Sequence, residues 1–210
     1  MPEVAIRRGF DDADRSAAAR LFWEAFRGKL GPVMRPEAKA LRFLEAAVDP
    51  AHALAALDED GALLGVAGFK TAGGGFVGGG LSDLAAVYGW PGALWRGTLL
   101  AVLERAPPPD LLQMDGIFVD EAARSRGVGG ALLGAIAQEA RDRGLSGVAL
   151  DVIDVNLRAR ALYERRGFEA VKTQTLGPFR HVFGFAAATR MERRFEGDGP
   201  AAQPPGDSPS

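Results

Sequence analysis

Apolar positions recur along the first half of the chain with the spacings of strands and helices. Residues 4–8 (VAIRR) predict a short strand. The apolar positions of the next segment share one helical face and predict a helix: Ala18, Leu21, Phe22, Ala25 and Phe26. A second amphipathic helix is predicted over residues 36–48 and ends at Asp49-Pro50. Residues 52–57 and 62–70 predict two strands joined by a turn at 58–61, so the chain begins strand, helix, helix, hairpin.

Residues 71–106 are less regular and predict a helical insertion. The run TAGGGFVGGG places six glycines between Gly73 and Gly80, which indicates either a flexible hinge or a loose hairpin. Helical spacing follows on both sides of a predicted break at residues 90–92 (WPG), and three prolines at 107–109 end the segment.

The second half of the chain alternates strands and helices. A largely apolar strand at 111–119 is followed by a polar, glycine-rich loop at 120–130 and a helix at 131–144. A strand at 148–153 and a helix at 156–166 come next. This order implies two neighbouring parallel strands, with the loop at the carboxyl end of the first.

Two further strands are predicted at residues 168–175 and 181–194. The remaining residues, 196–210, are rich in Pro, Gly and Ser and predict a disordered tail. We therefore expect a single domain over residues 1–195, with residues 71–106 inserted into it.

The amino-acid composition limits the kinds of site and partner that this chain can have. The 210 residues include no cysteine and two histidines, His52 and His181, which excludes thiolate sites and leads us to expect no metal centre. The net charge of −2 argues against nucleic acid as a partner. No segment has the length and apolarity of a membrane span, and the N-terminus lacks the pattern of a secretion signal. We expect a cytoplasmic protein without a membrane partner. A homodimer is one possible oligomeric state.

The loop between the strand at 111–119 and the following helix predicts an anion site. The chain has 28 glycines, about twice the usual proportion, and several lie in the run Arg124-Ser125-Arg126-Gly127-Val128-Gly129-Gly130. Backbone N–H groups and the positive end of a helix converge there, and two arginines add charge. A pyrophosphate is the natural ligand, the alternative being that the glycines only make a tight turn. Leu132 breaks the dinucleotide fingerprint, and the Gly-Lys-Ser/Thr phosphate loop is absent from the sequence.

Two motifs in this half resemble those of a known family. Arg124-x-x-Gly127-x-Gly129 is similar to the R/Q-x-x-G-x-G/A acetyl-coenzyme A signature of the GNAT superfamily of N-acetyltransferases. The run from Asn156 to Phe168 resembles that family's second signature, N-x-x-A-x-x-L-Y-E-x-x-G-F. The resemblance is specific over residues 111–170.

The resemblance implies an α/β (α+β) fold with a mixed, mostly antiparallel sheet, one splayed parallel strand pair and flanking helices. It implies that acetyl-CoA is the co-substrate, bound across residues 124–130, with backbone groups around Phe118 and Val119 holding the acetyl group. The acceptor would be an amine on a small molecule or peptide.

The second signature also makes geometric sense as a ligand-facing surface. Asn156 and Tyr163 are seven residues apart, about 700° around a helix, so they share one face. Asn156 is a candidate for hydrogen bonding the pantetheine arm, and the Tyr163 hydroxyl for protonating the departing thiolate. The alternatives are that Asn156 is only an N-cap and that Tyr163 only packs in the core.

A general base is also needed, because the attacking amine must be neutral. Asp115 is the candidate, since strand alternation would place Gln113, Asp115, Ile117 and Val119 on one face, and Gly116 suits a bulge that opens the sheet. The alternative for Asp115 is a structural carboxylate. His181 is a second candidate base, although a lone histidine is more often a surface or packing residue.

The sequence gives less information about where an acceptor would bind. The aromatic residues of the insertion either line an acceptor pocket or pack in the core: Tyr88, Trp90 and Trp95. The arginine-rich face at residues 158, 160, 165 and 166 is expected to be solvated surface. The leading hypothesis is direct acetyl transfer from acetyl-CoA to an amine. The alternatives are the use of another acyl-CoA, or a non-catalytic acyl-CoA-binding regulatory module.

Overall fold

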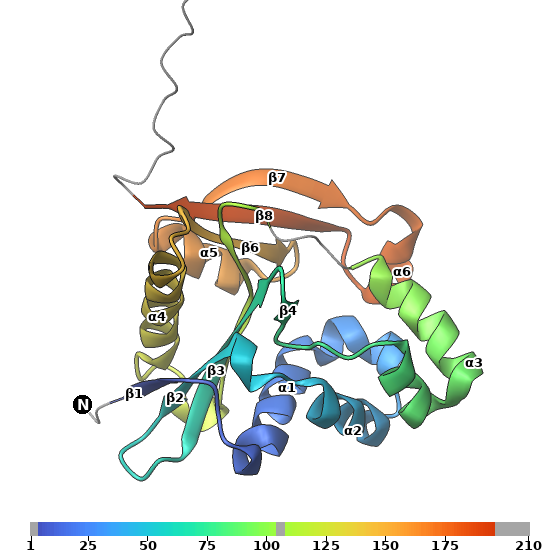
Figure 1. Cartoon of the computed structure of the whole chain (residues 1–210). Coiled ribbons are helices and arrows are strands. Elements are labelled where there is room, and N and C mark those ends of the chain that lie inside the picture. The colour runs from blue at the N-terminus through green and yellow to red at the C-terminus, as the bar shows by residue number, and fades with distance from the viewer. Residues whose placement is uncertain (1–3, 104–107, 196–210) are drawn as a thin grey trace, which may run out of the picture.

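A computed structural model describes residues 4–103 and 108–195 (Figure 1). The end of the predicted insertion, residues 104–106, and the predicted tail at 196–210 lie outside the described residues. The strands are β1 (Ala5–Arg8), β2 (Ala53–Leu57), β3 (Leu63–Thr71), β4 (Gly74–Gly75), β5 (Leu112–Val119), β6 (Gly147–Ile153), β7 (Glu169–Thr175) and β8 (Ala187–Arg194). The helices are α1 (Arg15–Met34), α2 (Glu37–Ala47), α3 (Leu81–Ala101), α4 (Val128–Asp142), α5 (Leu157–Arg165) and α6 (Arg180–Phe183).

The described strands form one mixed sheet in the order β1-β2-β3-β5-β6-β8-β7, with β4 paired to β3. All the described pairs between named strands are antiparallel except β5 and β6, which are parallel. The parallel pairing runs from Leu112↔Val148 to Met114↔Leu150, yet β5 continues to Val119 and β6 to Ile153. The expected mostly antiparallel sheet with one splayed parallel pair is therefore confirmed.

Helices cover the two faces of the sheet and make two separate cores. Apolar residues of α4 pack on one face, against side chains of β2, β3, β5 and β6. Helices α1 and α2 pack on the other face (Figure 1). Each helix forms because its apolar residues recur at 3.6-residue spacing and bury one stripe against the sheet.

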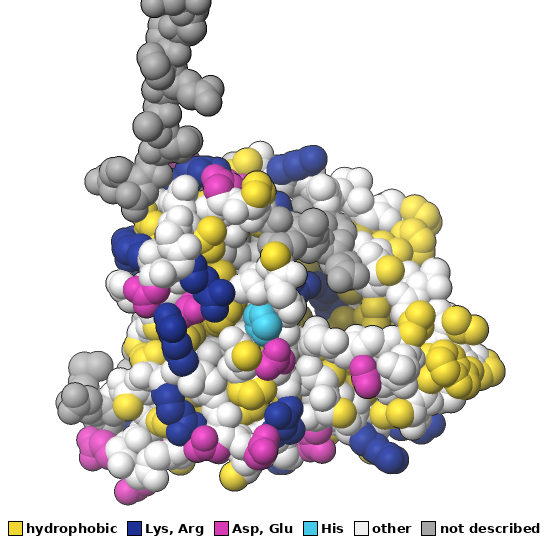
Figure 2. Space-filling model, viewed as in Figure 1, with side chains coloured by type: hydrophobic (Ala, Val, Ile, Leu, Met, Phe, Trp, Pro, Cys, Tyr) yellow, Lys and Arg dark blue, Asp and Glu magenta, His cyan; other side chains and the backbone are white. Residues whose placement is uncertain are grey.

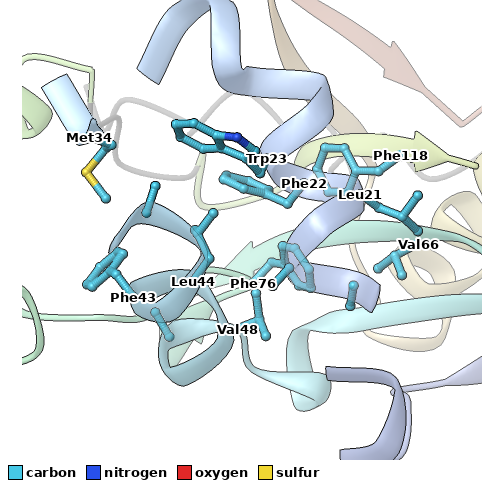
Figure 3. Close-up of a cluster of buried hydrophobic side chains, with 14 of the residues drawn as sticks. Leu21, Phe22, Trp23, Met34, Phe43, Leu44, Val48, Val66, Phe76 and Phe118 are labelled. Atoms are coloured by element: carbon cyan, nitrogen blue, oxygen red, sulfur yellow. The ribbon is translucent and has the colours of Figure 1, made fainter. Parts of the chain in front are cut away.

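Aromatic rings dominate the core on the α1 side. The Phe118 ring of β5 lies 5.3 Å from that of Phe22, 5.5 Å from Phe26 and 5.8 Å from Phe76, measured between ring centroids. Figure 3 shows Phe22, Phe76 and Phe118 in one cluster, together with Leu44 of α2. Gly116 is required here, because a Cβ on it would lie 2.8 Å from the Phe118 ring. The cluster ties α1 to β5 and so positions the strand that carries the candidate site.

The structure departs from the predicted elements in three places. Helix α4 begins at Val128 rather than residue 131, because Gly127 adopts the left-handed conformation (φ 86°) at the N-cap. The break in α3 falls at Gly89 (φ 71°), just before the predicted break at residues 90–92. The predicted strand at 181–194 is wrong in its first part, where Arg180–Phe183 form the short helix α6; β8 begins at Ala187. Within the described residues, no helix has the length and apolarity needed to cross a membrane.

Candidate active site

A cavity of about 730 Å³ opens where β5 and β6 stop pairing. Its lining residues come from α1, α2, α3, β5, the ends of β3 and β6, α5 with its N-cap, and α6. Figure 2 shows the surface hollowed beside a histidine side chain (cyan), with basic and apolar side chains in the depth of the hollow. Of the predicted site residues, the cavity brings together Asp115, Phe118, Asn156 and Tyr163.

A β-bulge at Asp115 shapes the cavity wall. Gly68 of β3 pairs with Gly116, but the next residue, Phe69, pairs with Met114, so Asp115 is an extra residue in β5. The predicted common face of Gln113, Asp115, Ile117 and Val119 is therefore wrong. The bulge breaks the two-residue alternation, and Ile117 and Val119 pack with the α4 core instead.

Asp115 is a largely buried carboxylate beside a lysine. Its Oδ1 lies 3.7 Å from the Lys70 Nζ, and its carboxylate accepts a hydrogen bond from the Phe76 backbone N–H. Burial raises the pKa of Asp115, and the positive charge of Lys70 partly opposes that shift. A carboxylate with a raised pKa in a cavity is a better proton acceptor than an ordinary aspartate.

Tyr163 and Asn156 contribute a phenol and an amide from α5 and its N-cap. The Tyr163 ring packs 5.7 Å from Phe168, and burial raises the pKa of its hydroxyl to about 12. The group is therefore a neutral O–H donor at physiological pH. Asn156 caps α5, since its Oδ1 accepts a hydrogen bond from the Ala159 N–H at 3.2 Å. Capping occupies only the oxygen, and the Nδ2 carries the donors that a ligand carbonyl would need.

The predicted anion loop lies at the far end of β5, next to Val119. Ser125 (φ 64°) and Gly127 (φ 86°) both adopt the left-handed conformation, which folds the loop into the start of α4. Gly129 and Gly130 belong to the first turn of this helix, whose leading N–H groups point out of the helix end. Arg124 donates from Nε to the Val119 carbonyl at 3.3 Å. A Cβ on Gly129 would meet only Val119, at 4.0 Å, so this glycine leaves the helix end open.

Sequence reasoning missed several residues at the site. Arg166 is exposed, as expected, but its guanidinium also lies over Gly130, with Nη2 only 2.7 Å from where a Cβ would be. Lys29 and Lys70 line the cavity. Lys70 could have been found from the sequence, because it is a lone charged residue at the end of the apolar strand LLGVAGFKT.

Other candidates lie away from the cavity. His181 is on α6, is exposed, and accepts a hydrogen bond from the Arg180 Nε at 3.2 Å; it does not line the cavity formed by the described residues. Trp90 and Trp95 are 63% and 45% exposed, so for them both the pocket and the core interpretations are wrong. Tyr88 is half-buried and donates a hydrogen bond to the Met34 carbonyl. Within residues 4–103 and 108–195, no group of three or more His, Asp or Glu side chains is arranged to hold a metal ion.

A sequence profile of the acetyltransferase (GNAT) family matches residues 16–168, which is more than half of the chain and includes the cavity strand, the loop and α5. The chain belongs to this family.

Solved structures agree with the family assignment at the level of the fold. An acetyltransferase is 24% identical, with 90% of this chain and 98% of that chain covered and a TM-score of 0.59. An N-acetyltransferase from Staphylococcus aureus Mu50 is 16% identical, with 90% and 100% covered and a TM-score of 0.63. A GCN5-related N-acetyltransferase from Kribbella flavida is 20% identical, with 91% and 98% covered and a TM-score of 0.57. A search among curated proteins finds no match.

The raised pKa of Asp115 predicts a pH dependence of the folding stability of this GNAT protein. Below the ordinary pKa of 3.8, Asp115 is protonated in both the folded and the unfolded chain and contributes nothing. As pH rises, the unfolded chain loses this proton first, so the free energy of unfolding falls until the folded-state pKa is passed. Relative to Asp115→Asn, the wild type should therefore lose stability as the pH rises above the ordinary pKa of 3.8, as measured by urea unfolding. The exposed turn variant Asp60→Asn controls for the loss of a carboxylate, and a difference that rises with pH would contradict the burial effect.

Proposed function

We propose that the protein is an acetyl-CoA-dependent N-acetyltransferase that transfers the acetyl group directly to an amine. The observation that carries the proposal is that one cavity contains both a buried carboxylate, Asp115, and a buried phenol, Tyr163, at the opening between β5 and β6. These groups supply the two proton transfers that amide formation from a thioester requires.

The residues around the cavity and the loop fit the proposed co-substrate. The start of α4, with Gly127 at its N-cap and Arg124 and Arg126 nearby, suits a pyrophosphate. Asn156 offers amide donors to the pantetheine arm. Beyond Met114, β5 runs without β6 as a described neighbour, so backbone groups around Phe118 and Val119 are suited to hold the acetyl carbonyl.

The chemistry follows from the order of proton transfers. Asp115 takes a proton from the acceptor ammonium, and the neutral amine attacks the acetyl carbon, forming the C–N bond. As the C–S bond breaks, the Tyr163 hydroxyl donates its hydrogen to the thiolate sulfur, and the proton lost by the new amide nitrogen restores the phenol. The products are the acetylated amine, the CoA thiol and one proton released to water. With a pKa of about 12, Tyr163 stays protonated until the thiolate appears.

Release of CoA thiol in the presence of a panel of amines tests the proposal. The panel should include amino acids, alkyl and aryl amines, aminoglycosides and peptide N-termini, and at least one of these should stimulate thiol release and become acetylated, as seen by mass spectrometry. Parallel assays with propionyl-CoA and longer acyl-CoA thioesters separate an acetyl enzyme from one that uses another acyl group. Tight CoA binding without turnover of any amine would instead favour a non-catalytic binding module.

Gly129→Val should weaken CoA binding, because its side chain would fill the opening at the start of α4. We expect about tenfold or greater loss of affinity by calorimetry, the scale of losing a charge-assisted contact. Gly134→Val is a matched control, since Gly134 lies in the same helix with open space around it and carries the same cost of a β-branched residue. Equal affinity of a folded Gly129→Val protein and the wild type would remove the phosphate role of the loop.

Tyr163→Phe should lower kcat by about a hundredfold or more, the usual contribution of a general acid. The ring packing against Phe168 is kept in this variant, so the KM for acetyl-CoA and the thermal stability should change little. Steady-state kinetics of thiol release measure both constants. A variant with wild-type kcat would show that the phenol does not protonate the leaving group.

A further inference from the structure

The cavity holds two carboxylates in different electrostatic settings. Asp151 is compensated by Arg190, whose Nη2 lies 3.6 Å from it, and it accepts a hydrogen bond from Gln113 at 3.3 Å. Asp115 has Lys70 at 3.7 Å. Both Asp115 and Lys70 line the cavity, so this is the ion pair that an acceptor meets.

The position of Lys70 is built into the sheet. In the register of β3 it stands opposite Gln113 of β5 and Gly75 of β4. A Cβ on Gly75 would lie 2.8 Å from the Lys70 Cγ, so the side chain runs across this glycine toward Asp115. Lys70 is 30% exposed and Asp115 is 17% exposed, which leaves both groups reachable from the cavity but poorly hydrated.

Proton transfer to Asp115 has an electrostatic consequence for Lys70. When Asp115 becomes neutral, the lysine loses its counter-charge in a partly buried setting, and this opposes the transfer. An acceptor that brings its own carboxylate removes the penalty, because that carboxylate replaces Asp115 as the partner of the ammonium. Lys29, whose ammonium lies over the rings of Phe26 and Phe185 at 5.4 and 5.8 Å, adds a second basic group to the cavity lining.

Much of the remaining lining of the cavity is apolar. It is made by side chains of α1, α2 and α3: Phe22, Leu30, Met34, Phe43, Leu84 and Leu100. A bound acceptor therefore meets hydrocarbon as well as charged groups, which favours an acceptor with an apolar body.

We propose that the acceptor is an apolar α-amino acid, whose amine addresses Asp115 while its carboxylate pairs with Lys70. The amine and carboxylate of an α-amino acid are separated by a single carbon, which suits two protein groups 3.7 Å apart. This inference rests on the proposed acetyl transfer and names its substrate class.

The test compares acceptors that differ only in the carboxylate. Thiol release from acetyl-CoA is measured with L-phenylalanine, L-phenylalaninamide and phenethylamine, and with L-leucine and 3-methylbutylamine, at equal concentrations of neutral amine. The wild type should favour the amino acids in kcat/KM by about tenfold or more, the scale of a charge-assisted pair. In Lys70→Gln this ratio should fall toward one, mainly through a higher KM for the amino acids.

Two controls separate recognition from structural damage. Lys172→Gln removes an exposed lysine on β7, outside the cavity, and should keep the wild-type ratio. Phenethylamine has no carboxylate to pair with Lys70. A change in its kcat/KM in Lys70→Gln therefore measures the effect of the substitution on Asp115, which every acceptor shares. Calorimetry of N-acetyl-L-phenylalanine with each protein gives a readout that needs no turnover, and Lys70→Gln should bind this product about tenfold more weakly.

The outcomes are distinct. A wild-type ratio near one, or better acetylation of another amine class, overturns the amino acid assignment and leaves the proposed acetyl transfer intact. A ratio that survives in Lys70→Gln overturns the role of Lys70. Absence of thiol release with the entire amine panel overturns the proposed function, and equal product binding by wild type and Lys70→Gln then overturns the inference as well.

Discussion

The site depends on the point at which β5 parts from β6. Parallel pairing ends at Met114, and the next residue, Asp115, is the bulged residue in the pairing with β3. One local irregularity thus opens the sheet, turns a carboxylate into the opening, and reverses the faces of the residues that follow. Phe118 then reaches the aromatic core beneath α1 while Val119 meets the start of α4. The cavity and the glycine loop at the start of α4 are therefore both positioned by β5, each through a different face of that strand.

Glycine has different physical roles in different parts of this chain. Gly116 lets the Phe118 ring pack against the strand, Gly127 supplies a left-handed N-cap, and Gly75 gives Lys70 a path to Asp115. Gly79 packs against α2, where a Cβ would lie 2.8 Å from the Phe43 ring. The six glycines at 73–80 thus include positions required by close packing, which neither a flexible hinge nor a loose hairpin explains.

Local features of the sequence predicted much of the fold. The strand–loop–helix unit around Gly127 and the helix that carries Tyr163 depend on neighbouring residues, so periodicity and capping signals locate them. The bulge that Gly116 indicated is present, but alternation could not predict its effect on the residues that follow, because the register is defined by pairing with β3, more than 40 residues away in the sequence. The same applies to Lys70, whose partner Asp115 comes from another strand. The strand prediction was wrong at Arg180–Phe183, because four residues of mixed polarity fit the pattern of a strand and that of a helix equally well.

Helix α3 supplies only apolar wall to the cavity and none of the groups assigned to proton transfer or to CoA. It is joined to α1 through the hydrogen bond from the Tyr88 hydroxyl to the Met34 carbonyl, and the Arg96 guanidinium stacks on Tyr88 at 4.0 Å. Substitutions along α3 therefore change the shape offered to the acceptor while leaving β5, α4 and α5 untouched. In evolutionary terms, we expect divergence in acceptor choice among related chains to concentrate in this segment, because the groups proposed to act on the acceptor amine and on CoA lie elsewhere.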